Sequence, residues 1–253
     1  MGTIGAGGSI LAVPVLVYIL EVDEVSATGY SLFIVGMASA FGMLDYFRRK
    51  EIKFSVALWF GIPSIFAVFA TRSFLIPALP ETIFTAGSFV LSKGLMIMAV
   101  FSIMMIAASV SMILPFREKS IQSGSVPNPF LSLLEGVLVG TFTGFVGAGG
   151  GFLIVPVLVM FFRLEMKTAI GTSLAIIAAK SLAGFGGEIM AHGNQIDWSI
   201  LSWFTSLSIA GSIAGSRLSR ILPAKSLKPV FGVFVFLTGV FIIGKEIAGG
   251  FRP

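Results

Sequence analysis

Long apolar runs follow one another along almost the whole chain. Seven stretches contain no charged residue or only one: 25–44, 54–71, 94–116, 130–162, 168–187, 200–216 and 230–244. A helix needs about 20 predominantly apolar residues to cross the hydrocarbon of a bilayer. The runs are continuously apolar rather than alternating, so they do not fit the strands of a membrane barrel. The pattern predicts an all-α, polytopic membrane protein.

Composition agrees with the apolar pattern. Hydrophobic residues make up 56% of the 253 positions and charged residues 11%, whereas soluble domains carry about 25% charged residues. The chain has a net charge of +5. Membrane proteins carry an excess of Lys and Arg in their cytoplasmic loops, so this charge does not indicate a nucleic acid partner. The chain has no cysteine and one histidine, His192, so we expect no disulfide, no metal site and no cofactor.

A glycine-rich motif of thirteen residues occurs twice, 142 positions apart. Residues 5–17 read GAGGSILAVPVLV and residues 147–159 read GAGGGFLIVPVLV, with ten identical positions. The similarity continues downstream in the same register, with ATGYSL at 27–32 and AIGTSL at 169–174. Glycine-rich packing segments would explain the composition of the two motifs but not their shared order.

The repeat predicts two related halves, residues 1–125 and 126–253, which together form one transporter domain. An apolar segment at 129–146 precedes the second glycine motif, whereas only four residues precede the first. The first half therefore either lacks its leading helix or begins inside it.

The distribution of basic residues indicates how the halves lie in the membrane, because cytoplasmic loops are enriched in Lys and Arg. If residues 130–162 form one continuous helix, the basic residues outside the spans divide eight against eight. If the glycine motif breaks this run into a hairpin, twelve fall on one side and four, Arg72, Lys93, Lys245 and Arg252, fall on the other. The twelve are Arg48, Arg49, Lys50, Lys53, Arg117, Lys119, Arg163, Lys167, Arg217, Arg220, Lys225 and Lys228. The bias favours two inverted-topology repeats, each with a glycine-broken helical hairpin, a common construction of secondary transporters.

Both glycine motifs are candidate anion-binding turns. The apolar segment after the second motif, 152–162, is too short to cross a bilayer at 1.5 Å per residue, so we expect glycine turns at membrane depth. Free amides at a helix N-terminus favour an anion, although glycines in membrane helices also permit close packing. The residues expected to bind are Gly5, Ala6, Gly7, Gly8 and Ser9 in the first motif and Gly147, Ala148, Gly149, Gly150 and Gly151 in the second.

Hydroxyl groups early in the helix after each motif extend the predicted site. Ser31 occupies one helix, and Thr172 and Ser173 occupy the matching positions in the other. Their hydroxyls can donate hydrogen bonds to an oxyanion, or they can bond back to carbonyls of their own helix.

Lys180 is the most informative single residue. It lies inside the otherwise apolar run 168–187, where a charge is costly and by default indicates a functional site. Two roles fit this position: neutralisation of an anionic substrate, or an ion pair with Glu188 or Glu135 that only holds helices together.

The duplicated GAGGS and GAGGG motifs, each followed by an apolar run containing Pro14 or Pro156, resemble the sulfite exporter TauE/SafE family of membrane permeases. The segments ATGYSL and AIGTSL and the basic turn RRKEIK at 48–53 are also similar to that family. The resemblance implies a multi-pass secondary transporter, not an enzyme, in the plasma membrane of a prokaryote. It also implies export of a small sulfur-containing oxyanion, sulfite or an organosulfonate, by alternating access.

The residues themselves leave other functions open. One is a proton-coupled transporter of another small anion or solute. Another is an intramembrane enzyme with Ser31 or Ser173 as nucleophile, which would require a nearby base. The partners expected are a small inorganic or organosulfur anion, the lipid bilayer and a coupling proton or ion, and the sequence defines no oligomeric state.

Overall fold

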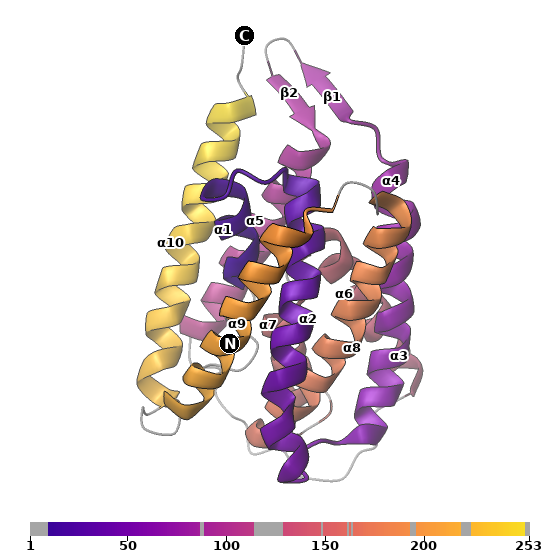
Figure 1. The fold of residues 1–253 in the computed structure, drawn as a ribbon, viewed down its shortest axis with the longest axis vertical. Helices are drawn as coiled ribbons and strands as arrows, with labels where there is room; N and C mark the ends of the chain where they lie inside the picture. Colours follow the sequence, from indigo (N-terminus) through magenta and orange to yellow (C-terminus); the bar gives the residue numbers. More distant parts are fainter. Residues whose placement is uncertain are drawn as a thin grey trace.

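The computed structural model describes residues 10–86, 89–113, 129–147, 149–160, 162, 164–192, 196–218 and 224–250. Nearly all of these residues are helical: α1 (Ala12–Tyr18), α2 (Glu24–Arg48), α3 (Phe54–Ala70), η2 (Thr71–Leu75), α4 (Ile76–Ala78), α5 (Lys93–Ile113), α6 (Pro129–Val146), α7 (Gly151–Met160), α8 (Met166–His192), α9 (Trp198–Leu218) and α10 (Ala224–Gly250). The long helices lie side by side along one axis, and a small β-hairpin projects at one end (Figure 1).

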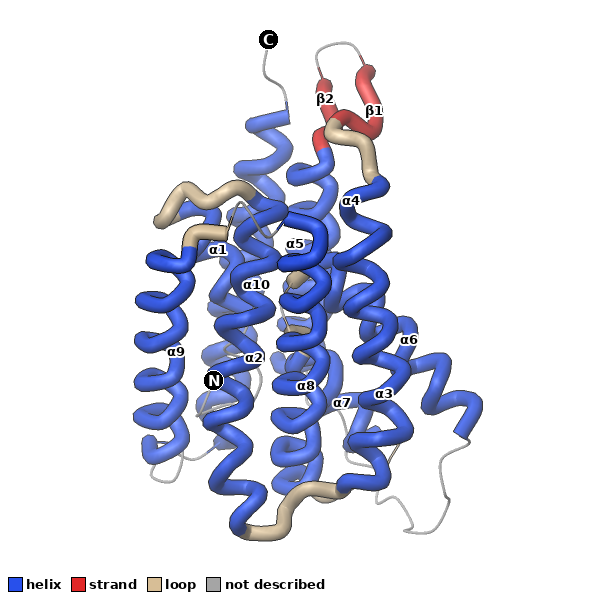
Figure 2. Tube along the Cα trace, turned by 45° about the vertical axis from the view of Figure 1, so that its right-hand side comes forward, coloured by secondary structure: helices blue, strands red, loops and turns tan. Residues whose placement is uncertain are grey.

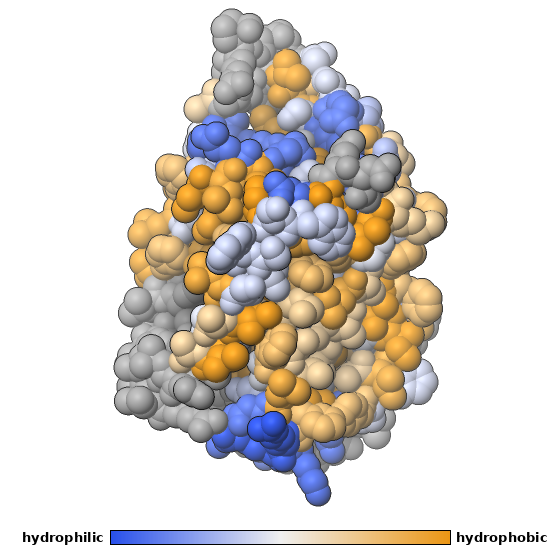
Figure 3. All heavy atoms as spheres, in the orientation of Figure 1, coloured by the Kyte–Doolittle hydropathy of each residue, from blue (hydrophilic) through white to orange (hydrophobic). Residues whose placement is uncertain are grey.

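Among the described residues, four helices are long and apolar enough to cross a membrane: Glu24–Arg48, Phe54–Ala78, Lys93–Val110 and Lys167–His192. On the face shown in Figure 3, the surface between the two ends of the bundle is mostly apolar, and the most hydrophilic residues lie towards the ends. Large side chains project from it, and Trp203 and Leu207 are 80% and 73% exposed. Such a surface fits lipid rather than water. The expected all-α, polytopic membrane fold is confirmed.

Two elements between α3 and α5 depart from the apolar pattern. The helix that begins at Phe54 does not end at residue 71 as expected, because it continues through the π-helical segment η2 and through α4 to Ala78. The strands β1 (Thr82–Ala86) and β2 (Phe89–Ser92) then form an antiparallel hairpin. Their Thr, Ile, Phe and Val residues are strand formers, and this hairpin was not expected from the sequence.

Helices α2 and α8 form an antiparallel pair in close contact. Near one end of the pair, a Cβ atom placed on Gly29 would lie 2.7 Å from Glu188 Cδ. Near the other end, a Cβ atom placed on Gly171 would lie 2.9 Å from Tyr46 Cβ. Glycine at both crossings therefore lets the helices approach more closely than any larger residue would allow.

Helices α3 and α9 flank this pair. A Cβ atom on Gly184 of α8 would lie 3.0 Å from Val68 Cγ2 of α3, and one on Gly42 of α2 would lie 3.5 Å from Ser212 Oγ of α9. Asp197 caps α9, since its side chain accepts hydrogen bonds from the backbone amides of Ser199 and Ile200.

Contacts at the two ends of the bundle fix which loops lie together. The backbone amide of Lys53, in the basic α2–α3 loop, donates to Thr172 Oγ1 near the start of α8. This end lies opposite the β-hairpin (Figure 2). Glu24, at the start of α2, instead lies against Gly94 at the start of α5, next to the hairpin. The basic α2–α3 loop and the start of α8 therefore lie at the same end, as the hairpin interpretation of the charges requires.

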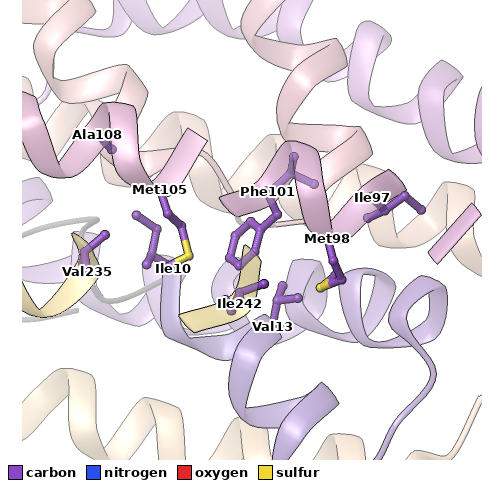
Figure 4. Close-up of a cluster of buried hydrophobic side chains, with 10 residues drawn as sticks. Ile10, Val13, Ile97, Met98, Phe101, Met105, Ala108, Val235 and Ile242 are labelled. Carbon is purple, nitrogen blue, oxygen red and sulfur yellow. The ribbon is translucent and has the colours of Figure 1, made fainter. Parts of the chain in front are cut away.

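The short helix α1 packs against α5 and α10. Ile10 and Val13 point into a cluster with Phe101 and Met105 of α5 and Ile242 of α10, all fully buried (Figure 4). At the end of α1, Tyr18 Oη donates a 2.6 Å hydrogen bond to Glu246 Oε1. In both ribbon views α1 lies towards the β-hairpin end and α7 towards the opposite end (Figure 1, Figure 2).

The second glycine motif breaks the run 130–162 into two helices. Helix α6 ends at Val146 and α7 begins at Gly151, and the intervening Gly147, Gly149 and Gly150 all have positive φ angles. The predicted break is therefore present in this motif. The first motif, Gly5 to Ser9, and Ala148 of the second motif lie outside the described residues.

Candidate anion site at the glycine turn

The turn between α6 and α7 is built from backbone that only glycine adopts readily. The φ angles are +74° at Gly147, +64° at Gly149 and +64° at Gly150, in the left-handed region. The Gly147 amide closes α6 by donating to Thr143 O at 2.9 Å, and Gly150 O accepts the first α7 bond, from the Ile154 amide at 3.1 Å. The amides at the start of α7 are left facing the turn because no carbonyl precedes them in the helix.

The surrounding helices leave no room for side chains on this turn. A Cβ atom at Gly147 would lie 2.2 Å from Thr28 O of α2, and one at Gly150 would lie 2.0 Å from Thr143 Cγ2 of α6. The tight packing means that the turn is shielded by protein at membrane depth, as non-helical backbone in a bilayer must be.

Lys180 reaches this turn from α8. It is the fifteenth of the 27 residues of that helix, its side chain is fully buried, and Nζ lies 2.9 Å from the position of a Cβ atom at Gly150. Nζ donates a 2.8 Å hydrogen bond to Thr143 Oγ1, and the Thr143 hydroxyl donates in turn to Gly140 O. Among the described residues, no carboxylate lies within ion-pair distance of Nζ. The ammonium group has three donors, so two remain for other acceptors.

Two serines complete the surroundings of the turn. Ser181 Oγ is fully buried, has no hydrogen-bond partner among the described residues, and lies 3.3 Å from the position of a Cβ atom at Gly149. Ser31 Oγ, also fully buried, donates to Gly147 O and so orients the turn. An unpaired buried hydroxyl is costly, which makes Ser181 a further ligand candidate that the sequence analysis did not name.

Thr172 and Ser173 do not join this group. Thr172 Oγ1 accepts from the Lys53 amide at 2.9 Å, and Ser173 Oγ donates to Ile170 O of its own helix at 2.8 Å. They precede Lys180 by eight and seven residues, which is about 10–12 Å along the helix axis at 1.5 Å per residue. The structure therefore brings together Ser31, the second glycine motif and Lys180.

A buried ion cluster lies on the hairpin side of the same turn. Arg72, in η2, is fully buried, and its Nε donates a 2.7 Å hydrogen bond to Gly144 O in the last turn of α6. Its Nη1 lies 3.0 Å from Glu188 Oε2 of α8, and the other oxygen, Oε1, lies 3.2 Å from His192 Nδ1. Two cationic side chains, Lys180 and Arg72, thus flank the glycine turn.

Sequence reasoning placed Arg72 outside the spans because the apolar run was taken to end at residue 71. The signal was present, since the apolar residues resume at Phe74 and the helical span extends to Ala78. An arginine inside a span that long is an intramembrane charge and calls for a partner. Glu188 is that partner, and so it is not the partner of Lys180.

The chemistry of the turn suits an oxyanion. Within the described residues, its donors are the buried Lys180 amine, which is bonded to Thr143, a buried hydroxyl without a partner and the first amides of a helix. These groups are positive or hydrogen-bond donors, and the low dielectric of a buried site strengthens their attraction for a negative ligand.

Comparisons with known proteins agree with the architecture. The family model described as sulfite exporter TauE/SafE matches residues 1–242. A probable membrane transporter protein of Xylella fastidiosa (strain Temecula1) is 26% identical over 251 residues, which cover 98% of this chain and 91% of that protein. Another from Methanocaldococcus jannaschii is 25% identical, covering 94% and 88%, and YunE of Bacillus subtilis is 23% identical, covering 96% and 92%. No solved structure matches at a significant level.

Proposed function

As this chain belongs to the sulfite exporter TauE/SafE family, we propose that it is a secondary transporter which moves a small oxyanion across the membrane by alternating access. The family, together with relatives named as probable membrane transporters, supports the general assignment as a membrane transporter. The anion, the mechanism and the binding residues are our proposal.

One observation carries the choice of an anion: the fully buried Lys180 amine lies against a glycine turn without a carboxylate beside it among the described residues. A buried cation normally pairs with an acid, because its desolvation is otherwise uncompensated. At Lys180 the compensating negative charge would come from the cargo. Gly149, Gly150, Ser181 and the first amides of α7 supply the remaining hydrogen-bond donors.

The internal repeat supports an inverted arrangement of the two halves. The contact of Gly29 with Glu188 has a counterpart in that of Gly171 with Tyr46, and each residue is 142 positions from its equivalent. This offset is the same as that between the glycine motifs. Because α2 and α8 are antiparallel, the axis that exchanges them lies across the helices, in the plane of the membrane.

The contacts of the flanking helices support the same axis. Gly184 packs against Val68 of α3, and its equivalent Gly42 packs against Ser212 of α9. We infer that residues 1–125 and 126–253 are the two repeats. Two similar halves around a central site can form two related packings, one open to each side of the membrane, which is the basis of alternating access.

The family description favours sulfite as cargo and export as direction. The relatives come from bacteria and an archaeon, which is consistent with the plasma membrane of a prokaryote. The basic end of the bundle, with Lys50, Lys53 and Lys167, would face the cytoplasm. These finer assignments rest on the family name and on the charge distribution.

The structure offers less support for a serine-type enzyme. Ser31 Oγ donates to Gly147 O and Ser173 Oγ donates to Ile170 O. A nucleophilic serine must transfer its proton to a base, and a peptide carbonyl cannot take that role.

The experiment that tests the function is transport by the purified chain in proteoliposomes. Vesicles with the protein are compared with empty vesicles for uptake of labelled sulfite, sulfate, methanesulfonate, sodium ion and glycerol. We expect protein-dependent uptake of at least one oxyanion and none of sodium ion or glycerol. Protein-dependent uptake of sodium ion or glycerol without any oxyanion would contradict the proposal.

A further inference from the structure

Two buried polar atoms without a hydrogen-bond partner lie on either side of Glu188. One is Arg72 Nη2, the guanidinium nitrogen that neither Glu188 nor Gly144 engages. The other is His192 Nδ1, which lies 3.2 Å from Glu188 Oε1 but makes no hydrogen bond. Buried polar atoms in folded proteins are almost always paired, and His192 Nδ1 has the Glu188 carboxylate within ion-pair distance, so Arg72 Nη2 is the atom that indicates an entering species.

Arg72 Nη2 and His192 Nδ1 differ in the chemical groups that they can bind. Arg72 Nη2 is a donor on a permanently charged group and can bind only an acceptor, such as an oxyanion. His192 carries two ring nitrogens and can relay a proton from one to the other, and its side chain is 29% exposed, whereas those of Arg72 and Glu188 are almost fully buried. His192 is therefore the member of this cluster that lies nearest the surface, and its Nδ1 lies beside Glu188.

We infer that Arg72, Glu188 and His192 form a proton-controlled second anion site, in which a proton on Glu188 releases Arg72 to bind the transported oxyanion. This inference rests on the proposed transport function. Arg72 and Lys180 then contact the anion from opposite sides of the glycine turn. Residues 180 and 188 are two helical turns apart on α8, about 12 Å at 1.5 Å per residue.

The proton step balances as follows. His192 takes a proton from water at Nε2 while its Nδ1–H proton passes to Glu188 Oε1, so the imidazole ends neutral and Glu188 becomes a neutral acid. Arg72 loses its counter-ion, and the incoming anion replaces that negative charge. One proton therefore accompanies each anion bound, and the site keeps the same net charge with and without its cargo. Release of the anion restores the Arg72–Glu188 pair and returns the proton.

The neighbours of Glu188 limit the alternatives. Arg72 from η2 and His192 from α8 are the charged or titratable groups within ion-pair distance in the described part of the chain. From α2, Gly29 packs against the carboxylate and Val25 O lies 3.5 Å from Arg72 Nη1. From α6, only the Gly144 carbonyl is bonded to this group. The charge of Glu188 therefore determines whether the Arg72 guanidinium is paired within the protein or is free to bind an anion.

The test uses labelled sulfite uptake into proteoliposomes that contain the pH dye pyranine, at an external pH of about 6 and about 8, the range over which histidine changes charge. The variant Glu188→Gln imitates the protonated acid and keeps an acceptor for Arg72. We expect the wild type to acidify the lumen more than empty vesicles do and to take up sulfite about tenfold faster in acid. Uptake by Glu188→Gln is expected to change less than about twofold between the two conditions.

A matched control is Glu135→Gln, which removes another carboxylate from a span and should keep the acid acceleration of the wild type. The double variant Arg72→Gln/Glu188→Gln leaves no unpaired buried charge, and it should take up sulfite about tenfold more slowly than Glu188→Gln alone. Equal acid acceleration in Glu188→Gln and the wild type would overturn the inference while leaving the proposed transport intact. Absence of protein-dependent sulfite uptake in the wild type at either pH would instead count against the proposed function itself.

Discussion

Lys180 Nζ donates a 2.8 Å hydrogen bond to Thr143 Oγ1, and the two residues come from different helices on either side of the glycine turn. This bond fixes the end of a fully buried lysine at the middle of α8, beside Gly150. It also links the residue that carries the charge to the helix that ends at the turn. The hydrogen bond therefore links the position of the Lys180 amine to the conformation of the glycine turn between α6 and α7.

Replacement of Thr143 by valine should weaken this arrangement. The side chain keeps its shape but no longer accepts from Lys180, and a buried donor without a partner costs about 1–3 kcal/mol. We expect a lower midpoint of thermal unfolding in detergent and slower anion uptake. The control is Thr205→Val on α9, because Thr205 Oγ1 is buried without a partner and its loss should leave the midpoint unchanged or higher. Equal behaviour of the two variants would show that the bond has no energetic role.

Gly150→Ala should disrupt the turn itself. A residue with a Cβ atom at a φ of +64° costs about 1 kcal/mol. The new atom would also lie only 2.0 Å from Thr143 Cγ2. We expect lower thermal stability and loss of uptake. In contrast, Gly244→Ala on α10 has open space around it and should be neutral or stabilising, so similar losses in both variants would contradict the special role of the turn.

The topology can be tested with single cysteines, because the chain contains none. Lys50→Cys and Lys167→Cys should react with a membrane-impermeant maleimide from one side of the membrane. Glu81→Cys, next to the hairpin, should react only from the other side. The two lysine positions fall on the same side only if residues 130–162 form a broken hairpin. Labelling of these two positions from opposite sides would rule out that arrangement.

The glycine break was predictable because it determines on which side of the membrane every later loop lies. A continuous helix at 130–162 would have put Lys53 and Lys167 on opposite sides, whereas the structure brings the Lys53 backbone into contact with Thr172 at the start of α8. Hydropathy also placed Lys180 inside an apolar span, and in the structure it lies within the candidate span Lys167–His192. Both features follow from the high cost of charge and of unpaired backbone in lipid.

Other parts of the site depended on contacts between distant segments. Arg72 is buried because η2 packs between α6 and α8. The residues near Arg72 in the sequence do not indicate that packing. Likewise, a hydroxyl in a helix can point towards a site or back to its own carbonyls, and Ser173 bonds to Ile170 O. Ser181 differs from Ser173 only in what the neighbouring helices place around it. Its orphan hydroxyl is visible only in the folded chain.

The central claim, that a buried lysine at a glycine turn binds the transported oxyanion, is tested most directly by the initial rate of labelled sulfite uptake in proteoliposomes. Lys180→Ala is compared with Lys167→Ala, which removes an exposed lysine from the same helix. The account predicts that Lys180→Ala lowers the rate by about a hundredfold, the loss expected for a charge-assisted contact of about 2–3 kcal/mol, and that Lys167→Ala transports like the wild type. Equal rates in the two variants, with both proteins folded, would contradict it.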